Sequence, residues 1–470
     1  MIGRRNEAAM LKNLMESHES EFAVLYGRRR IGKTYLVNEV FGKDYAFHHA
    51  GLRDGDTRKQ LDAFRLALRR QGYFDCPRLR NWLEAFFELE NHLGRSDKKR
   101  KVVFLDEMPW MDTPKSGFLS ALESFWNGWA CLRKDIVLIA CGSATSWMVK
   151  NIIRNSGGLY NRVRTRIRLQ PFSLLECREY ANNELHLRYS NREIAECYMV
   201  FGGVAYYWSL LEKGKSLAQN IDALFFSEQD GLRGEYDELY RSIFRHPDMY
   251  WKIVASLGER RDGLTRDELL GKTGVQSNGT FSRCLSDLEE CGFIRRYATS
   301  ARGINGGVYQ LADNFTLFYR RFVLGRRNRD GDCWQSALSD GEKNEWLGFA
   351  FERTCLAHIR QIKTALGISG VHAEAYSWRG TASDGSPAQI DLVLDRKDGI
   401  VNVCEMKYSR KKYAIDKAES ERLQRRVETL RSHIGADRSI HLTMITASGV
   451  EHNMYWNDIQ SEVTLDDLFT

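Results

Sequence analysis

Residues 27–34 have the types and the spacing of a phosphate-binding loop. They follow an apolar run, precede a predicted helix, and read Gly27, Arg28, Arg29, Arg30, Ile31, Gly32, Lys33 and Thr34. Glycines let such a loop curl, so that its backbone N–H groups and the helix N-terminus face the phosphates of a nucleotide. Lys33 is expected to reach the β and γ oxygens, and Thr34 to offer its hydroxyl to Mg²⁺. The pattern therefore predicts a site for ATP with magnesium.

Two acidic residues follow a second apolar run, and a serine follows a third. Asp106 is placed to hold the magnesium shell, and Glu107 to polarise the attacking water. Acidic groups at the carboxyl end of a central parallel strand lie where such sheets bind ligands. Ser143, after Cys141 and Gly142, places a small hydroxyl at the sensor position.

A row of arginines occupies positions 162, 164, 166 and 168. Arg162, with Arg164 as the second choice, is a candidate to offer its guanidinium to the γ-phosphate bound by its own or a neighbouring subunit. The same row also fits a basic strand that faces solvent or nucleic acid. The sequence leaves both interpretations open.

Strand-like and helical segments alternate along the part of the chain that positions the phosphate-binding residues. Apolar runs at 22–26, 101–105 and 136–140 are separated by helical stretches, which predicts parallel strands in a βαβ sheet. Residues 171–240 are mostly helical and are expected to form a lid. Residues 1–240 are therefore predicted to be an α/β core with a helical lid.

Residues 241–328 are predicted to form a winged helix. The expected helices lie near 246–257, 265–273 and 279–291, and the two strands at 293–297 and 308–311. In such a unit, Ser282 and Arg283 on the third helix, with Arg302 in the wing, would meet phosphates and base edges. The alternative is that the unit only packs between its neighbours.

A polar stretch at 329–343 is predicted to be a linker, and residues 344–470 a further α/β domain. Two strands, 389–395 and 400–407, flank a short turn that ends in glycine. The resulting register sets Asp391 opposite Glu405 and puts Lys407 on the same face. Such a cluster can hold Mg²⁺ while the ammonium steadies a water or a phosphate, although a surface ion pair is the other interpretation.

The first half of the chain resembles the archaeal-type ATPases of the AAA+/STAND group of P-loop NTPases. The matching segments are residues 2–7, 26–34, 105–107, 142–143, 159–162 and 202–204. Relatives usually have glycine before Arg162 and proline after the 202–204 triplet, where this chain has Asn161 and Ala205. The resemblance implies ATP binding and hydrolysis with Mg²⁺.

The last domain is similar to the PD-(D/E)XK nuclease superfamily. The pattern of that superfamily falls on Asp391, Glu405 and Lys407, and its customary helix glutamate on Glu352. The resemblance implies a restriction-endonuclease-like α/β fold, a metal site at Asp391, Glu405 and Glu352, and possible cleavage of nucleic acid.

Composition supports a folded protein of several domains. The chain has 470 residues, of which 43% are hydrophobic and 28% charged, and its net charge of +7 permits a nucleic-acid partner, with DNA expected. The 10 cysteines show no metal-ligand spacing, and no apolar run approaches a membrane span, so a cytoplasmic location is expected. A homo-oligomer is compatible with the arginine row.

The leading hypothesis is an ATPase that couples nucleotide state to nucleic-acid engagement and to a metal-dependent nuclease-like domain. A rival is a STAND-like signalling switch whose last domain binds without cleaving. A third interpretation is a structural oligomer that uses ATP for assembly. The complete set of Asp391, Glu405 and Lys407 favours the first, because binding alone does not need all three.

Overall fold

The computed structural model describes residues 2–42, 44–227, 231–244, 246–275, 277–297, 307–325, 334–335, 339–382, 385–435 and 437–470. The chain divides into two compact units. The first comprises Met1–Pro171 and Glu238–Pro247, and the second Phe172–Asp237 and Asp248–Thr470. The helices expected as a lid on the first sheet thus group mostly with the second unit. The domain bounds expected from the sequence stay a prediction.

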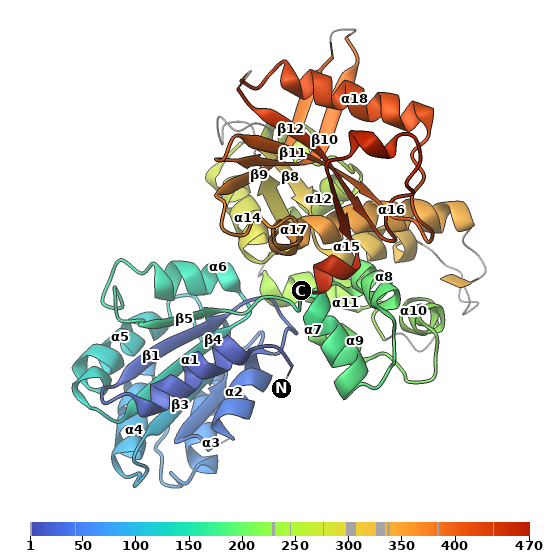
Figure 1. The fold of residues 1–470 in the computed structure, drawn as a ribbon. Helices are drawn as coiled ribbons and strands as arrows, with labels where there is room; N and C mark the ends of the chain where they lie inside the picture. Colours follow the sequence, from blue (N-terminus) through green and yellow to red (C-terminus); the bar gives the residue numbers. More distant parts are fainter. Residues whose placement is uncertain are drawn as a thin grey trace. The chain divides into compact units, whose positions relative to one another are not determined.

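The first unit is built on a five-stranded parallel sheet in the order β2-β3-β4-β1-β5 (Figure 1). Its strands are β1 (Glu21–Tyr26), β2 (Phe47–Ala50), β3 (Lys101–Asp106), β4 (Ile136–Gly142) and β5 (Thr165–Arg168). Its helices are α1 (Arg5–Glu16), α2 (Lys33–Phe41), α3 (Thr57–Arg70), α4 (Trp82–Gly94), α5 (Phe118–Gly128), α6 (Thr145–Met148) and most of α11 (Glu235–Ile243). The predicted α/β class and the three predicted parallel strands are confirmed.

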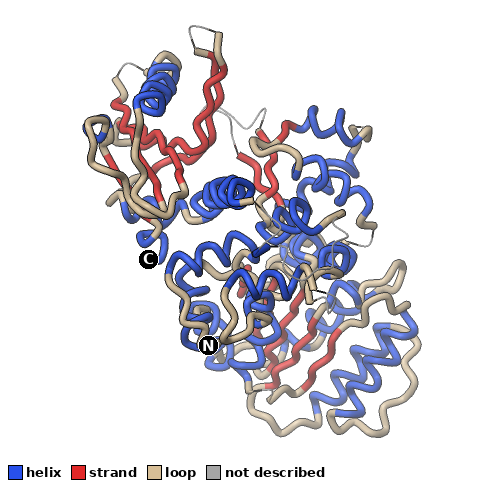
Figure 2. Tube along the Cα trace, turned by 90° about the vertical axis from the view of Figure 1, so that its right-hand side faces the viewer, coloured by secondary structure: helices blue, strands red, loops and turns tan. Residues whose placement is uncertain are grey.

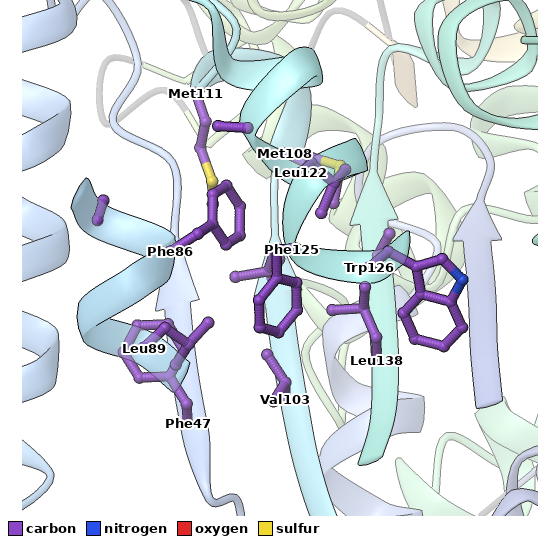
Figure 3. Packing of buried hydrophobic residues seen from close by; sticks show 14 of the residues in the cluster. Phe47, Phe86, Leu89, Val103, Met108, Met111, Leu122, Phe125, Trp126 and Leu138 are labelled. Carbon is purple, nitrogen blue, oxygen red and sulfur yellow. The ribbon is translucent and has the colours of Figure 1, made fainter. Parts of the chain in front are cut away.

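One face of this sheet is covered by α3, α4 and α5. Alternate residues of the strands, such as Val103 and Leu138, pack against aromatic side chains of the helices, such as Phe86 and Phe125 (Figure 3). Phe125 and Trp126 of α5 are almost completely buried. Burial of this apolar surface is the main force that holds the strand ends in place.

The second unit begins with helices and continues into a small antiparallel sheet. The first helices are α7 (Leu174–Glu179), α8 (Asn191–Phe201), α9 (Ala205–Ser209) and α10 (Leu217–Phe225). Next come α12 (Asp248–Gly258), β6 (Leu264–Thr265), α13 (Arg266–Thr273), α14 (Gly279–Glu290), β7 (Ile294–Tyr297) and β8 (Val308–Leu311), with the strands in the order β6-β8-β7. These elements lie close to the positions expected from the sequence, and a winged helix stays a prediction. Arg302 lies outside the described residues.

The last part of the second unit is a five-stranded mixed sheet in the order β13-β12-β11-β10-β9 (Figure 2). The strands are β9 (Ala373–Thr381), β10 (Pro387–Arg396), β11 (Ile400–Lys407), β12 (Ser439–Thr446) and β13 (Ser461–Thr464). The helices of this region are α15 (Asn314–Phe318), α16 (Asp340–Ala357), α17 (Ile359–Ala365) and α18 (Lys417–Arg431). Leu423 and Leu430 of α18 join the core on one face of the sheet, together with Val401 and Val403 of β11.

The last residues of the predicted linker at 329–343 lie in a helix, and the linker itself stays a prediction. Helix α16 begins at Asp340, because Ser339 and Glu342 form a capping box in which each side chain binds the other's backbone N–H. The serine and acidic residues that suggested a loop are therefore the start of the helix that carries Glu352.

Two features of the described chain bear on its environment. None of the helices in this part of the chain combines the length and the apolar character that a membrane span requires. The nine cysteines among the described residues are all free, and eight of them are buried, Cys131 being partly exposed.

Candidate functional site

The phosphate-binding loop joins β1 to α2, and two glycines allow its path. Gly27 has a φ of 146° and Gly32 a φ of 92°, values that residues with side chains rarely adopt. A Cβ atom on Gly27 would lie 2.3 Å from the carbonyl oxygen of Leu169. The loop therefore needs glycine at position 27 both for its backbone conformation and for the close approach of the chain beside β5.

Lys33 is buried at the start of α2, and its ammonium points back into the loop. It donates to the carbonyl oxygens of Gly27 at 3.0 Å and Arg28 at 2.8 Å, and to Ser143 Oγ at 2.9 Å. These three bonds use all three of its donors. A phosphate bound in the loop would have to replace some of these oxygens as the partner of the ammonium.

Thr34 and Asp106 meet across the gap between α2 and the end of β3. The hydroxyl of Thr34 donates to Asp106 Oδ2 at 2.7 Å, and Asp106 Oδ1 accepts from the backbone N–H of Glu107 at 2.9 Å. A hydroxyl and a carboxylate are hard oxygen ligands of the kind that magnesium prefers. The two predicted magnesium residues therefore lie together and suit that ion.

Glu107 and Ser143 lie beside Lys33 at the ends of β3 and β4. Ser143 donates from its hydroxyl to Glu107 Oε1 at 2.5 Å and from its backbone N–H to Oε2 at 3.2 Å. Glu107 has a φ of 44°, an uncommon conformation for a residue other than glycine. Ser143 thus connects the lysine and the glutamate, and the backbone strain falls at the predicted catalytic carboxylate.

The remaining loop residues divide between the interior and the surface. Ile31 and Arg28 are buried, whereas Arg29 reaches Glu238, whose carbonyl oxygen lies 3.5 Å from Nη1 and whose carboxylate lies 3.9 Å away. Arg53 forms an ion pair with the same carboxylate. Sequence reasoning missed Glu238 and Arg53, because no spacing in the chain connects them to the loop.

Arg162 is exposed in the turn before β5 and takes no part in the bonds just described. Arg164, the second choice, forms ion pairs with Glu19 at 2.8 Å and Glu21 at 3.6 Å. Asn161 has a φ of 55°, which explains how this chain replaces the usual glycine, since asparagine tolerates the left-handed conformation better than most residues.

A second cluster of charged side chains lies in the last sheet. The register of β10 and β11, with Leu392 opposite Cys404 and Asp395 opposite Val401, is the one predicted from the sequence. Continued by one residue, it sets Asp391 opposite Glu405. A pocket of 300 Å³ is lined by the four predicted residues together with neighbours: Arg261, Asp262, Glu352, Gln389, Asp391, Glu405, Lys407, Arg422 and Arg426.

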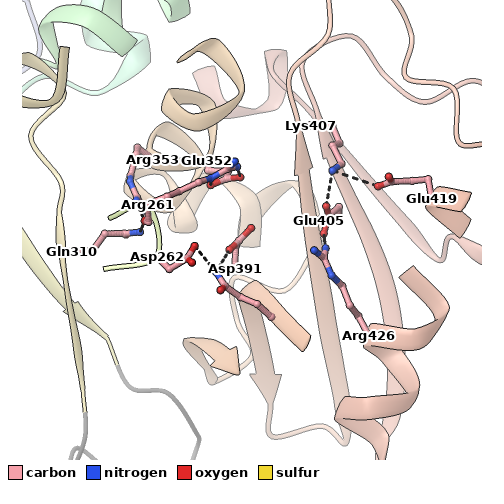
Figure 4. A network of polar contacts seen from close by, with 11 residues as sticks. Arg261, Asp262, Gln310, Glu352, Arg353, Asp391, Glu405, Lys407, Glu419 and Arg426 are labelled. Atoms are coloured by element: carbon pink, nitrogen blue, oxygen red, sulfur yellow. Dashed lines mark hydrogen bonds and ion pairs between the residues drawn. The ribbon is translucent and has the colours of Figure 1, made fainter. Parts of the chain in front are cut away.

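On β11, Glu405 and Lys407 form an ion-paired network with α18 (Figure 4). Lys407 Nζ lies 2.8 Å from Glu405 Oε1 and 3.4 Å from Glu419 Oε1, and Arg426 pairs with the other oxygen of Glu405. Burial opposes the charged form of Lys407, but the Glu405 carboxylate outweighs it and raises the pKa of the ammonium. Lys407 therefore carries its positive charge.

At the other side of the pocket, Glu352 of α16 pairs with Arg261 (Figure 4). Burial, followed by the negative charge of Asp391, raises the pKa of Glu352 to about 7, with Arg261 acting in the opposite direction. Asp391 Oδ1 accepts from Gln389 Nε2 at 3.0 Å, and the same amide group donates to Asp262 Oδ1 at 3.1 Å. Each carboxylate of this side already has a protein donor.

The structure therefore gathers the predicted residues of the last domain in one pocket, but it pairs Glu352 and Glu405 with cations and Asp391 with an amide. Among the residues that the structure describes, no group of three or more His, Cys, Asp or Glu side chains is arranged to hold a metal ion. The carboxylates are of the right chemical kind for Mg²⁺, yet their oxygens contact Arg261, Arg426 and Lys407. A metal role for Asp391, Glu405 and Glu352 stays a prediction.

The arginines of this pocket were not among the predicted residues. Arg422 and Arg426 are four residues apart, so the helical period alone puts them on one face of α18, and that spacing could have been noticed. Arg261 lies outside any motif, in the connection between α12 and β6, and only the folded chain brings it to Glu352.

Known proteins are similar to the first part of the chain. Residues 1–211 match a family described as an ATPase domain predominantly from Archaea. An uncharacterized protein of Methanocaldococcus jannaschii is 26% identical over 365 residues, which is 75% of each chain. The Walker-type ATPase of Pyrococcus abyssi has a TM-score of 0.49 and 17% identity, over 68% of this chain and 96% of its own.

The ORC2 protein of Aeropyrum pernix, solved with ADPNP and ADP, has a TM-score of 0.40 and 15% identity, over 67% of this chain and 92% of its own. The family match covers the phosphate-binding loop together with Asp106, Glu107 and Ser143, whose contacts are described above. Over its first 211 residues the chain is therefore similar to an ATPase domain of the archaeal type.

Proposed function

We propose that this chain hydrolyses ATP at the loop between β1 and α2, with Lys33 binding phosphate and Glu107 activating the water. The observation that supports these roles is the position of Ser143, whose hydroxyl joins the Lys33 ammonium to the Glu107 carboxylate. A γ-phosphate bound by Lys33 would disturb this pair of bonds and so release the carboxylate of Glu107. Ser143 would thereby report whether the loop holds a triphosphate.

Each residue has a distinct task in this proposal. The loop backbone and Lys33 bind the phosphates, and the Thr34 hydroxyl and the Asp106 carboxylate hold Mg²⁺. The metal supplies positive charge for the β and γ oxygens. Glu107, freed from Ser143, accepts a hydrogen bond from the attacking water and orients it in line with the γ-phosphorus.

Two variants separate binding from hydrolysis. Lys33→Ala should abolish ATP binding, because the ammonium contacts phosphate in the ground state, whereas Glu107→Gln should bind ATP and lose turnover by roughly a hundredfold or more. Fluorescent-nucleotide titration and phosphate release would be measured, with Lys98→Ala, a surface ion-pair variant, as control. Turnover at the normal rate in both variants would contradict the assignment.

We further propose that the unit from α12 to β8 engages nucleic acid. Its third helix, α14, exposes Ser282 and Arg283, and Arg266 donates to Ser282 Oγ at 3.1 Å. Affinity for duplex DNA, measured by fluorescence anisotropy, should fall steeply as salt rises from about 50 to 200 mM, since phosphate contacts release counterions. Arg283→Gln should weaken binding more than Arg360→Gln, an exposed arginine of α17. Equal affinities would make this unit a packing module.

A second candidate function, metal-dependent cleavage of nucleic acid, is favoured by the pocket of the last sheet. That pocket contains Asp391, Glu405, Lys407 and Glu352 together, as the resemblance implies. Nicking of plasmid DNA with Mn²⁺ should disappear in Asp391→Asn and Lys407→Ala, while Asp398→Asn, an acidic residue of the same hairpin paired with Arg396, should cleave normally. Absence of cleavage by the unmodified protein would favour a switch whose last domain only binds.

Arg162 is proposed to act on the ATP of a neighbouring copy of the chain. Its exposed position before β5 is compatible with a contact between subunits, whereas Arg164 is held by Glu19 and Glu21. Arg162→Ala should reduce turnover by at least roughly tenfold, and Arg166→Ala, on the same row, should not. Mixing Arg162→Ala with Glu107→Gln should restore part of the turnover only if the arginine acts between subunits.

A further inference from the structure

The connection between α12 and β6, residues 259–263, lies against the pocket of the last sheet. It contributes Arg261 and Asp262 to the walls of that pocket. The Arg261 guanidinium pairs with both oxygens of Glu352, and Asp262 shares the Gln389 amide with Asp391. The segment therefore contacts, directly or through one amide, the two carboxylates on this side of the pocket.

The backbone of this segment is held independently of the Arg261 side chain. The carbonyl oxygen of Arg261 accepts from Gln310 Nε2 at 2.8 Å and from Arg353, and that of Asp262 accepts from Arg379 at 2.6 Å. Arg353 and Gln310 are themselves buried. Replacement of the Arg261 side chain should therefore leave the course of the chain unchanged.

The two partners of the ion pair differ in exposure. The Glu352 side chain is 8% exposed and that of Arg261 is 55% exposed. A buried carboxylate needs a positive partner or a proton, whereas an exposed guanidinium can turn into water at little cost. The arginine is therefore the member of the pair that can leave, and a cation that replaces it would lie beside Glu352 in the pocket that Asp391 also lines.

We propose that Arg261 occupies the place of a divalent cation and keeps the pocket of the last sheet closed to metal until its guanidinium turns out of the pocket. This inference rests on the proposed metal role of Glu352 and Asp391. The segment belongs to the unit proposed to engage nucleic acid, so engagement and metal entry are coupled through one arginine. The positive charge beside Glu352 then comes from Arg261 while the pocket is closed, and from the metal ion once Arg261 has left.

The test measures Mn²⁺ binding to the full-length protein by isothermal titration calorimetry, without nucleotide. Four variants are compared with the unmodified chain: Arg261→Gln, Asp391→Asn, the double variant of these two, and Lys272→Gln. Lys272 forms an ion pair with Glu259 at 2.8 Å, so its replacement removes a positive charge that contacts the same segment without touching the pocket. Circular dichroism of each variant confirms that it is folded.

Arg261→Gln should bind Mn²⁺ at least roughly tenfold more tightly than the unmodified chain, because a like charge a few ångströms from the metal is removed. Asp391→Asn should cancel this gain in the double variant, and Lys272→Gln should produce none. Equal affinity in Arg261→Gln and the unmodified chain, lost in Asp391→Asn, would overturn the role of Arg261 and leave the metal site standing. Absence of Asp391-dependent binding in every variant would overturn the metal site as well.

Discussion

The two charged sites of this chain are assembled in opposite ways. In the first unit, the predicted residues bind one another and the backbone: Lys33 bonds to loop carbonyls, Thr34 to Asp106, and Ser143 to Glu107. In the second unit, acids are neutralised by arginines from other segments, as in the Glu352 and Arg261 pair, and Glu405 also by Lys407 of its own strand.

This difference affects what each site needs in order to bind a ligand. The loop offers donors that can turn from protein oxygens to phosphate oxygens, so a nucleotide exchanges one set of hydrogen bonds for another. The pocket of the last sheet must first lose a cation before it can gain one. The first site can therefore accept an anion by exchanging hydrogen bonds, whereas the second requires a charged side chain to move away first.

The largest effect is expected from breaking the backbone of the first site. Gly27→Ala should weaken ATP binding by more than about a hundredfold, because the new Cβ would lie 2.3 Å from the Leu169 carbonyl oxygen. Gly42→Ala is a matched control: it also has a positive φ, of 58°, but has open space around the added atom. Similar losses of affinity in both variants would show that the loss of ATP binding is caused by the backbone conformation and not by the clash. Fluorescent-nucleotide titration measures both.

The next largest effect is expected from a substitution that disrupts the ion-paired network of the second site. Glu405→Gln leaves Lys407 and Arg426 without their shared carboxylate and should lower the opening free energy of the last sheet by about 3 kcal/mol. Glu259→Gln removes the exposed pair with Lys272 and should cost less than about 1 kcal/mol. Amide hydrogen exchange in β11 measures both values. A loss at Glu405 no larger than at Glu259 would mean that the network does not stabilise the sheet.

A smaller effect is expected from removal of the Ser143 hydroxyl, which connects Lys33 to Glu107. Ser143→Ala should reduce kcat by roughly tenfold to a hundredfold and change the Kd for ATP little, since Lys33 keeps its loop partners. Ser20→Ala, which removes a hydroxyl bonded to the Arg133 carbonyl in the same unit, serves as control. If Kd rose as much as kcat fell, Ser143 would belong to binding and not to the catalytic step.

The smallest effect comes from an ion-paired acid in the first unit. The hydrogen bond from Arg133, followed by that from Lys101, holds the pKa of Asp135 at about 2 against an ordinary value of 3.8. The contribution to stability is therefore complete above pH 4 and is lost as the pH falls towards 2. The stability difference between the unmodified chain and Asp135→Asn should shrink by about 1 kcal/mol between pH 5 and pH 2 in urea unfolding. A constant difference would contradict the assigned pKa.

Much of the first site was predictable, because its chemistry depends on neighbours in the chain. The loop, Asp106 and Glu107 follow apolar runs that had to be strands, and strand ends of one parallel sheet meet at one edge. Strand β2 was not predicted, and β5 only as one of two interpretations of the arginine row. Residues 47–50 contain two histidines, and β5 alternates arginine with other residues, so neither has the continuous apolar run of a buried parallel strand.

The second site was predictable along its hairpin and, through the resemblance, at Glu352. The turn ending in Gly399 fixed the register, and the register fixed the positions of Asp391 and Glu405. Nothing local connects Arg261 to Glu352, which are 91 residues apart, or relates Arg426 to Glu405. Those pairs depend on how helices and loops pack on the sheet, and packing between distant segments leaves no short-range signal.

The reactivity of the buried free cysteines can report when each unit of the protein opens. Cys76 and Cys141 lie in the core of the first unit, and Cys355 and Cys404 in that of the second. Because a buried thiol reacts with an alkylating reagent only when its surroundings open, pulse alkylation read by mass spectrometry would date the opening of each unit separately, without any engineered label.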